Sequence, residues 1–176
     1  MISIKKSMYE LERISANDFK ESSKRPIIIV LENVRSAYNV GSIFRTADAF
    51  LIEAIYLIGY TACPPHKEIS KTALGATETV KWQHFDTSTA AINNLKLLNY
   101  EVFAIEQAQP NISLEKYNWQ HKPTAFIFGN EVNGVEQDTI NCCNGCLEIP
   151  QWGTKHSFNI TIAAGIVLWQ CISWKL

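Results

Sequence analysis

The chain lacks the glycine patterns that hold nucleotides in the commonest α/β enzymes. None of its 8 glycines belongs to a Gly-x-Gly-x-x-Gly turn after a strand, and no Gly-Lys-Ser/Thr phosphate loop occurs. Both absences argue against a dinucleotide-dependent dehydrogenase and against a P-loop enzyme. A nucleotide-like cofactor would therefore have to be held in another way.

Strong net charge, membrane-length apolar runs and metal-site cysteine spacing are also missing. The formal net charge is −1, so any contact with nucleic acid would be a local patch. The C-terminal apolar run is interrupted and shorter than the roughly 20 residues that span a bilayer. Cys143 and Cys146 form one Cys-x-x-Cys pair without a second pair, so we expect no metal. No signal peptide is evident, and we expect reduced thiols in a cytoplasmic protein.

Segments with strand and helix character alternate along the chain. Short apolar segments predict strands at residues 26–31, 54–58, 79–83, 101–105, 124–128 and 146–149. Helical patterns lie at residues 39–50, 88–98, 135–142 and 158–173. This alternation predicts an α/β fold with a mainly parallel sheet and helices on both faces. We expect a short N-terminal arm at residues 1–24 and one domain at residues 25–176, with a full core.

The first polar segment of interest follows the predicted strand at 26–31 and runs from Asn39 to Phe50. Asn39 is the predicted N-cap of a helix, and Arg45 would then lie within the first two turns of that helix. Because open α/β sheets bind ligands at the carboxyl ends of their strands, Arg45 is a candidate site residue. The alternative is that Arg45 pairs with Asp48 on a solvated helix face.

Two later segments have similar character. Glu131 is the only acid inside a turn flanked by Gly129 and Gly134, although it also suits a plain turn or the positive end of a helix dipole. Ser157 and Asn159 fall where the last helix should begin, so side-chain oxygens and unpaired backbone donors converge on one small pocket. Taken alone, this pair also fits simple helix capping.

In this order and spacing, the three segments resemble the motifs of the SpoU (TrmH-like) family of RNA ribose 2′-O-methyltransferases, within the SPOUT superfamily. The resemblance extends from about residue 26 to Trp174. The matching positions are Asn39, Gly41, Arg45, Thr46, Ala49 and Phe50 in the first motif, Gly129, Glu131 and Gly134 in the second, and Ile149, Pro150, Gly153, Ser157, Asn159 and Ala163 in the third. Leu51, Gln151 and Phe158 depart from the residues usual in the family, and the last two would alter the shape of an adenosine pocket.

The resemblance implies transfer of a methyl group from S-adenosylmethionine to a ribose 2′-hydroxyl of tRNA or rRNA, on a fold with a C-terminal trefoil knot. The catalytic set that it implies is Arg45, Asn39, Glu131, Ser157 and Asn159. The cofactor-binding set that it implies is Gly129, Ile149, Pro150, Gly153, Phe158 and Asn159. Arginine is a poor base because its pKa lies above about 12. Either the pocket perturbs Arg45, or Arg45 clamps the adjoining phosphate while another group accepts the proton.

The resemblance further implies a homodimer with the last helix in its interface. Residues 160–174 are apolar on most sides of that helix, which fits such burial. Cations near the motifs are candidate RNA contacts, namely Arg35, Lys67, Lys71 and Lys155, with Lys67 and Lys71 in a long loop. Two other functions remain open: a non-catalytic RNA-binding or assembly protein that keeps the fold, and a nucleotide-handling α/β enzyme of another kind.

Overall fold

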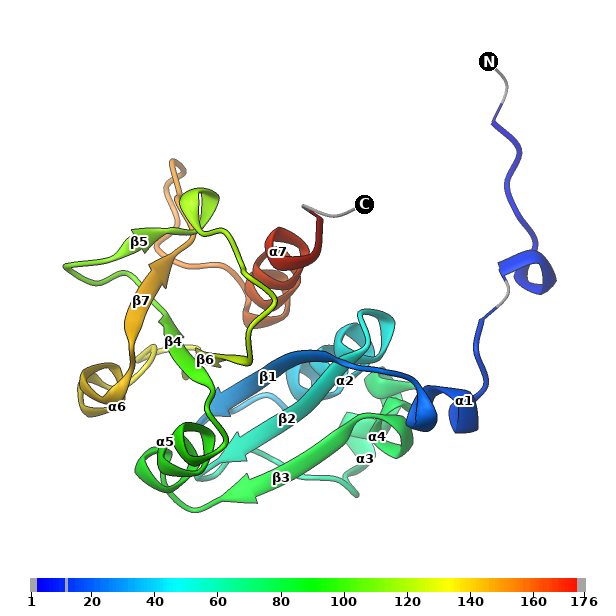
Figure 1. Ribbon diagram of the computed structural model, residues 1–176, viewed down its shortest axis with the longest axis horizontal. Helices are drawn as coiled ribbons and strands as arrows, with labels where there is room; N and C mark the ends of the chain where they lie inside the picture. The colour runs from blue at the N-terminus through cyan, green and yellow to red at the C-terminus, as the bar shows by residue number, and fades with distance from the viewer. Residues whose placement is uncertain (1–2, 12, 174–176) are drawn as a thin grey trace.

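The computed structural model describes residues 3–11 and 13–173 of the chain (Figure 1). Its centre is a seven-stranded sheet in the order β3-β2-β1-β6-β4-β7-β5, in which neighbouring strands pair in parallel. The strands are β1 (Arg25–Glu32), β2 (Ile52–Ile58), β3 (Lys81–Phe85), β4 (Glu101–Ile105), β5 (Ile112–Ser113), β6 (Thr124–Phe128) and β7 (Gly145–Glu148). Trp174, one of the apolar residues predicted on the last helix, lies outside the described residues.

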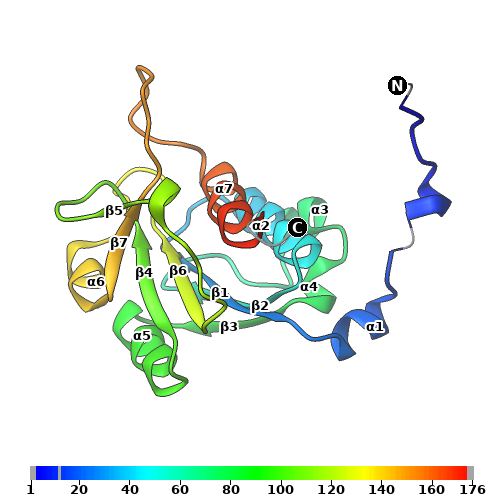
Figure 2. The same ribbon diagram turned by 45° about the horizontal axis from the view of Figure 1, so that its top comes forward.

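Helices cover both faces of this sheet, as Figures 1 and 2 show. The helices are α1 (Ala16–Glu21), α2 (Ala37–Ala49), α3 (Lys67–Ala73), α4 (Ala76–Thr79), α5 (Ser88–Leu97), α6 (Gln137–Cys142) and α7 (Ile160–Ile172), with 3-10 turns η1 (Met8–Leu11) and η2 (Leu114–Lys116). Helices α2, α3, α4 and α7 share one core cluster with the sheet, whereas α5 belongs to the other. The α/β fold with a parallel sheet and helices on both faces is therefore confirmed.

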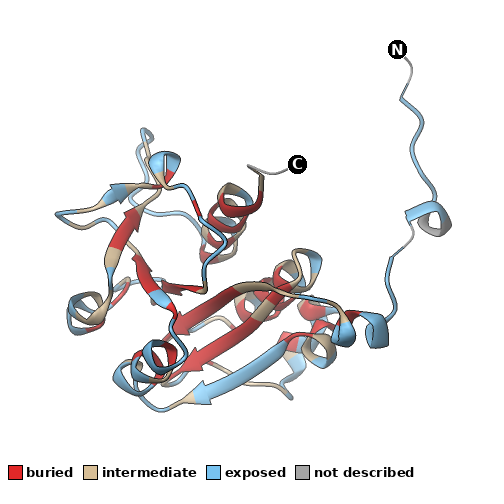
Figure 3. Cartoon of the chain, viewed as in Figure 1, coloured by how far each residue is buried: buried red, intermediate tan, exposed pale blue. Residues whose placement is uncertain are grey.

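Alternation along β1 builds the two cores. Ile27, Ile29 and Leu31 belong to the core under α2 and α7, while Ile28 and Val30 belong to the core under α5. A parallel strand buried on both faces needs a continuous apolar run, which is what the sequence has here. Figure 3 shows the resulting contrast between the buried central strands and the exposed edge strand β3.

The predicted strands and helices are found, with shifted boundaries. The third strand begins at Lys81, because the preceding residues form α4. Within residues 25–173, four elements were not predicted: α3, α4, β5 and η2. The segment after β2 was expected to be a long loop, but α3 begins directly after His66, whose side chain accepts a hydrogen bond from the backbone N–H of Glu68 at 3.2 Å.

The start of α2 also differs from the prediction. Ser36, not Asn39, is the N-cap, and its hydroxyl accepts a hydrogen bond from the backbone N–H of Asn39 at 3.3 Å. Asn39 therefore lies within the first turn of the helix. In this position its side chain is free to bond elsewhere, and this shapes the site described below.

Residues 3–11 lie well away from the sheet in both views (Figures 1 and 2). Helix α1 itself is anchored, because its Phe19 is buried in the same core as α2. Within the described part of the chain, no helix is long and apolar enough to cross a membrane.

Candidate functional site

A cavity of about 520 Å³ opens at the carboxyl ends of β4, β6 and β7. Three loops surround it: those that follow β4 and β6, and the long connection from β7 to α7. Its apolar lining consists of Ile105, Phe128, Val132, Ile149, Phe158, Ile160 and Ala163. The volume lies in the range of small-molecule sites, and the mixture of apolar walls with a few polar groups is typical of them.

Glu131 lines this cavity and ties its loop to the start of α2. The Glu131 carboxylate accepts hydrogen bonds from the backbone N–H groups of Arg35 at 2.9 Å and Ser36 at 3.1 Å. It also accepts a hydrogen bond from the side-chain amide of Asn39 at 3.1 Å. Burial alone would raise the pKa of Glu131, but these hydrogen bonds outweigh it and hold the pKa below its ordinary value. Glu131 is therefore an anion at neutral pH.

A lowered pKa at Glu131 predicts a pH-dependent contribution to stability. The contribution of the carboxylate is fully present above the unfolded-state pKa of about 4.3 and is lost as the pH falls through the lower folded-state value. We expect Glu131→Gln to lower the free energy of unfolding by about 1 kcal/mol at pH 7, because the charged hydrogen bonds of the carboxylate are lost. The loss is no larger because solvent exposure of Glu131 weakens these bonds. Urea unfolding should show this deficit shrinking below about pH 4. An equal deficit at every pH, or one matched by the exposed Glu115→Gln, would contradict the assignment.

Asn39 extends this contact to the third predicted segment. The side-chain amide of Asn159 donates to Asn39 Oδ1 at 3.4 Å, while Asn159 Oδ1 accepts from the backbone N–H of Thr161 at 2.9 Å. Asn159 therefore caps α7, as the capping interpretation predicted, and also contacts the start of α2. Glu131, Asn39 and Asn159, which lie up to 120 positions apart, form one connected set. Ser157 lines the cavity beside them and is exposed.

Arg45 is not part of this set within one chain. It lies in the third turn of α2, roughly 12 Å along the axis from the start of the helix, and does not line the cavity. The predicted position in the first two turns was wrong because the helix begins earlier than expected. Arg45 is exposed and makes no hydrogen bond or ion pair with the residues that the structure describes. Asp48, its alternative partner, instead accepts a hydrogen bond from Thr79 Oγ1 at 2.5 Å.

Four of the six predicted cofactor-binding residues line the cavity, namely Gly129, Ile149, Phe158 and Asn159. Pro150 and Gly153 do not. Gly129 is irreplaceable sterically, because a Cβ there would lie 2.1 Å from the carbonyl carbon of Gly134. Among the described residues, the backbone groups of Ile149 and Phe158 make no hydrogen bond. These groups, set between apolar walls, can bind the polar edge of a purine, so the cavity fits an adenosine-containing cofactor.

Two lining residues, Glu106 and Gln107, were missed from the sequence. The Gln107 side-chain amide donates to the backbone carbonyl of His156 at 2.5 Å, which joins the exit of β4 to the connection before α7. The available signal was position: both residues directly follow a predicted strand, at the edge of the sheet where ligands bind.

The four candidate RNA contacts are all exposed: Arg35, Lys67, Lys71 and Lys155. Lys67 and Lys71 lie on α3 and not in a loop. Lys71 Nζ is 3.4 Å from the hydroxyl oxygen of Tyr38 and 5.8 Å from the centre of its ring. This contact places the α3 cations beside the N-terminal turn of α2.

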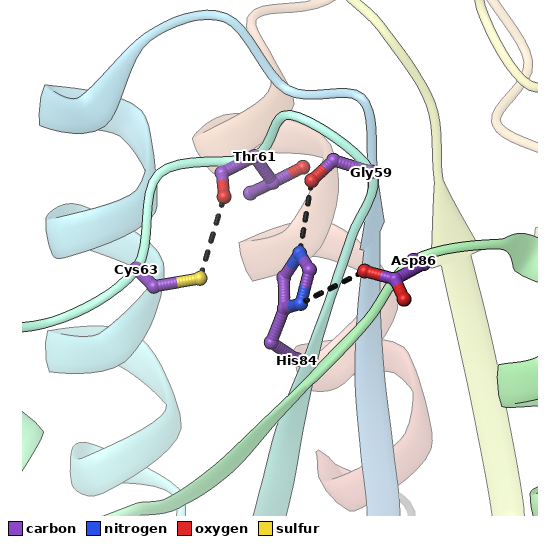
Figure 4. A network of polar contacts seen from close by, with 5 residues as sticks. All are labelled: Gly59, Thr61, Cys63, His84 and Asp86. Carbon is purple, nitrogen blue, oxygen red and sulfur yellow. Dashed lines mark hydrogen bonds and ion pairs between the residues drawn. The ribbon is translucent and has the colours of Figure 1, made fainter.

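A separate polar network holds the loop after β2 (Figure 4). His84 Nε2 is 2.9 Å from the carbonyl oxygen of Gly59, and His84 Nδ1 is 3.9 Å from Asp86 Oδ1. The Cys63 thiol donates to the Thr61 carbonyl at 3.5 Å, and burial raises the pKa of that thiol. Cys63 is therefore a poorly activated nucleophile. Within residues 3–11 and 13–173, no group of three or more His, Cys, Asp or Glu side chains could hold a metal ion.

The model of the SpoU rRNA Methylase family matches residues 26–169. The chain belongs to this family. The match contains all three polar segments and every strand of the sheet except the first residue of β1. Glu131, Asn39 and Asn159 therefore all lie within the part of the chain that matches the family model.

Curated relatives of the family act on RNA ribose. The chain is 28% identical over 146 residues to the 23S rRNA (guanosine-2'-O-)-methyltransferase RlmB of Neisseria meningitidis, covering 83% of this chain and 58% of that relative. It is 24% identical over 151 residues to the tRNA (guanosine(18)-2'-O)-methyltransferase of Aquifex aeolicus, covering 85% of this chain and 70% of that relative. The chain thus spans little more than half of the Neisseria protein.

Solved structures share the fold. An rRNA methyltransferase from Sinorhizobium meliloti superposes with a TM-score of 0.79 at 27% identity, covering 87% of this chain and 57% of that one. The SpoU methyltransferase AviRb from Streptomyces viridochromogenes, solved in complex with the cofactor AdoMet, superposes with a TM-score of 0.78 at 17% identity, covering 90% and 61%. The second similarity supports the fold alone.

Proposed function

We propose that this protein is an RNA 2′-O-methyltransferase that transfers a methyl group from S-adenosylmethionine to a ribose 2′-hydroxyl of tRNA or rRNA. The observation that carries the proposal is the cavity at the strand ends, whose lining residues Glu131 and Asn159 are both hydrogen-bonded to Asn39 of α2. The curated relatives named as guanosine-2'-O-methyltransferases support the reaction type. We also propose a cytoplasmic location, which suits the five free thiols.

In this proposal the backbone of Gly129, Ile149 and Phe158 holds the adenosine part of the cofactor, and Pro150 and Gly153 shape the connection that covers it. When bound, S-adenosylmethionine supplies a methyl group that is already activated by its sulfonium. The protein must then align the ribose hydroxyl and stabilise the charge that develops on it. We assign Ser157 and Asn159, which line the cavity just before α7, the role of holding the target nucleotide.

Arg45 is proposed to serve the partner subunit's cavity in a homodimer. It lies at the exposed side of α2, one helical turn before the exposed Ala49, and roughly 12 Å along α2 from the end that contacts Glu131. A guanidinium that makes no hydrogen bond or ion pair with residues 3–11 and 13–173 of its own chain can bind the phosphate next to the target ribose bidentately. We assign it this clamping role, together with stabilisation of the developing alkoxide.

An apolar surface on α7, which packs beside the C-terminal end of α2, supports the homodimer. Ile162 and Trp169 lie seven residues apart on the same side of α7 and are 54% and 53% exposed. The Trp169 ring lies 6.5 Å from that of Phe50, which directly follows α2. Large apolar side chains exposed together on one face mark an interaction surface. A second copy of the chain on this surface would bring each Arg45 toward the other subunit.

Two parts of the architecture remain proposals. We propose that residues 25–176 form the catalytic domain, with residues 1–24 as an arm. We also propose the trefoil knot that the family resemblance implies. A crystal structure of the protein with the cofactor would test both, and an unknotted path through residues 129–159 would refute the second.

RNA is proposed to reach the cavity across Arg35, Lys67, Lys71 and Lys155. We expect the double variant Lys67→Glu and Lys71→Glu to weaken RNA binding and to reduce the slope of log affinity against log salt by about 2. Cofactor affinity should not change. Lys116→Glu with Lys122→Glu makes the same charge change at exposed lysines elsewhere. If filter binding shows equal losses for the two pairs, the assigned surface is wrong.

Two measurements test the proposed function. Isothermal titration should show one S-adenosylmethionine bound per chain, and incubation of the loaded protein with RNA from cells lacking it should yield new 2′-O-methyl marks. A folded protein that binds RNA but not S-adenosylmethionine would instead support the non-catalytic alternative, which the unusual Gln151 and Phe158 in the cavity favour. Mapping the new marks would identify the RNA and the nucleotide.

A further inference from the structure

Glu106 lines the cavity with a carboxylate that is held in place by its surroundings. Its Oε1 accepts a hydrogen bond from the backbone N–H of Gln107 at 2.8 Å, and its Oε2 accepts one from the backbone N–H of Val135 at 3.1 Å. The main chain of Glu106 is also fixed, because its N–H donates to the Leu147 carbonyl at 3.1 Å and its carbonyl accepts from the Cys146 thiol at 3.2 Å. The position of the carboxylate therefore depends little on what binds.

Gly134 shows how closely this carboxylate is packed against the loop after β6. A Cβ at Gly134 would lie 2.1 Å from Glu106 Oε2, and Gly134 has a positive φ of 70°. Glycine is thus needed both for the backbone conformation and for the contact with the carboxylate. On the other side, Gln107 joins the same strand exit to His156. Glu106 consequently lies between the two loops whose backbone is proposed to hold the adenosine.

The two carboxylates of the cavity differ in the hydrogen bonds that they have left. A carboxylate offers about four acceptor positions. Glu131 already accepts from Arg35, Ser36 and Asn39. Glu106 accepts one hydrogen bond on each oxygen and keeps one acceptor position on each. Two adjacent acceptor positions match the two hydroxyl donors of a vicinal diol.

We propose that Glu106 accepts hydrogen bonds from the 2′- and 3′-hydroxyls of the cofactor's ribose and so fixes the adenosine in the cavity. The inference rests on the proposed function, because it presupposes S-adenosylmethionine as the ligand. An acid after a parallel strand plays the same part toward ribose in dinucleotide-binding folds, although the glycine fingerprint of those folds is missing here. Glu106 also carries a negative charge near the cofactor, so the ammonium and the sulfonium are the competing partners.

Glu106→Gln separates these partners when three ligands are compared by isothermal titration. S-adenosylmethionine carries the diol, the ammonium and the sulfonium; S-adenosylhomocysteine lacks the sulfonium; 5′-methylthioadenosine keeps only the diol. We expect the variant to weaken all three by the same factor, about 10-fold or more. A different result would overturn the inference: 5′-methylthioadenosine binds both proteins with equal affinity, whereas S-adenosylmethionine binds Glu106→Gln more weakly than the wild type. Glu106 would then pair with a cation of the cofactor. Glu101→Gln, at the other end of β4, is the matched control and should change nothing.

A second comparison guards against a variant that only loosens the loop. The wild-type protein should bind 2′-deoxy-5′-methylthioadenosine about 10-fold more weakly than 5′-methylthioadenosine, whereas Glu106→Gln should bind the two with similar affinity. A loss that is equal in both proteins would show that the hydroxyl does not contact Glu106. Failure of the proposed function gives a different result, because the folded wild-type protein would then bind no S-adenosylmethionine at all.

Discussion

Arg45→Ala should abolish methyl transfer to RNA and leave the binding of S-adenosylmethionine intact. The side chain is exposed, makes no hydrogen bond or ion pair with the described residues, and does not line the cavity of its own chain. Its loss should change the free energy of unfolding by no more than about 0.5 kcal/mol. Removing a charged donor that stabilises a developing oxyanion typically lowers the rate at least about 100-fold, or roughly 3 kcal/mol. Methyl incorporation, titration and thermal unfolding measure the three quantities.

Arg13→Ala, an exposed arginine in the N-terminal arm, is the control for a general loss of positive charge. Full activity of Arg45→Ala would end the catalytic assignment. Weaker binding of S-adenosylmethionine by that variant would also contradict it, because the arginine is assigned to the nucleotide and not to the cofactor.

Mixing two inactive variants tests whether Arg45 acts across subunits. Ser157→Trp should block the cavity mouth, since Ser157 is exposed and lines it, and titration can verify that the cofactor no longer binds. After exchange of subunits, half of the dimers would be mixed, and each would hold one intact pair of arginine and cavity, giving about a quarter of the wild-type activity. Continued inactivity of a mixture shown to contain mixed dimers would place Arg45 and the cavity in the same chain.

The sequence predicted the layers of the fold because apolar periodicity determines them. Strand β1 is apolar at five successive positions, from Ile27 to Leu31, and is buried on both faces. Helix α3 was missed because Pro64 and Pro65 precede it and because only a narrow stripe, Ile69 and Ala73, is buried. Short helices of this kind are stabilised by packing and carry little periodic signal.

The contacts within the site could not be derived from the sequence in the same way. Glu131 reaches the start of α2 because β6 lies beside β1 in the sheet, although 91 residues (33–123) lie between the end of β1 and the start of β6. Strand order is a property of the folded sheet and leaves no periodic pattern. Motif resemblance identified the residues, whereas their pairing, and the displacement of Arg45 from the cavity, required the structure. Neither apolar periodicity nor motif resemblance indicated Glu106, because it belongs to no motif considered in the sequence.

The double variant Ile162→Glu and Trp169→Glu should turn a dimer into a folded monomer without methyltransferase activity. Two carboxylates at the centre of an apolar interface would have to lose their hydration for the subunits to associate. In the monomer the same side chains face water, so circular dichroism should match the wild type. Light scattering at micromolar concentration should show twice the mass of the chain for the wild type and the mass of one chain for the variant.

Leu97→Glu with Leu98→Glu is the matched control, since both leucines are exposed at the C-terminal end of α5, on the other face of the sheet. This pair should stay dimeric and active. The loss of activity in the α7 variant follows from the separation of Arg45 from the cavity in each chain, not from a damaged cavity. A wild-type protein that is monomeric and fully active would therefore refute both the dimer and catalysis across subunits, because a single chain would then have to bring Arg45 to its own cofactor.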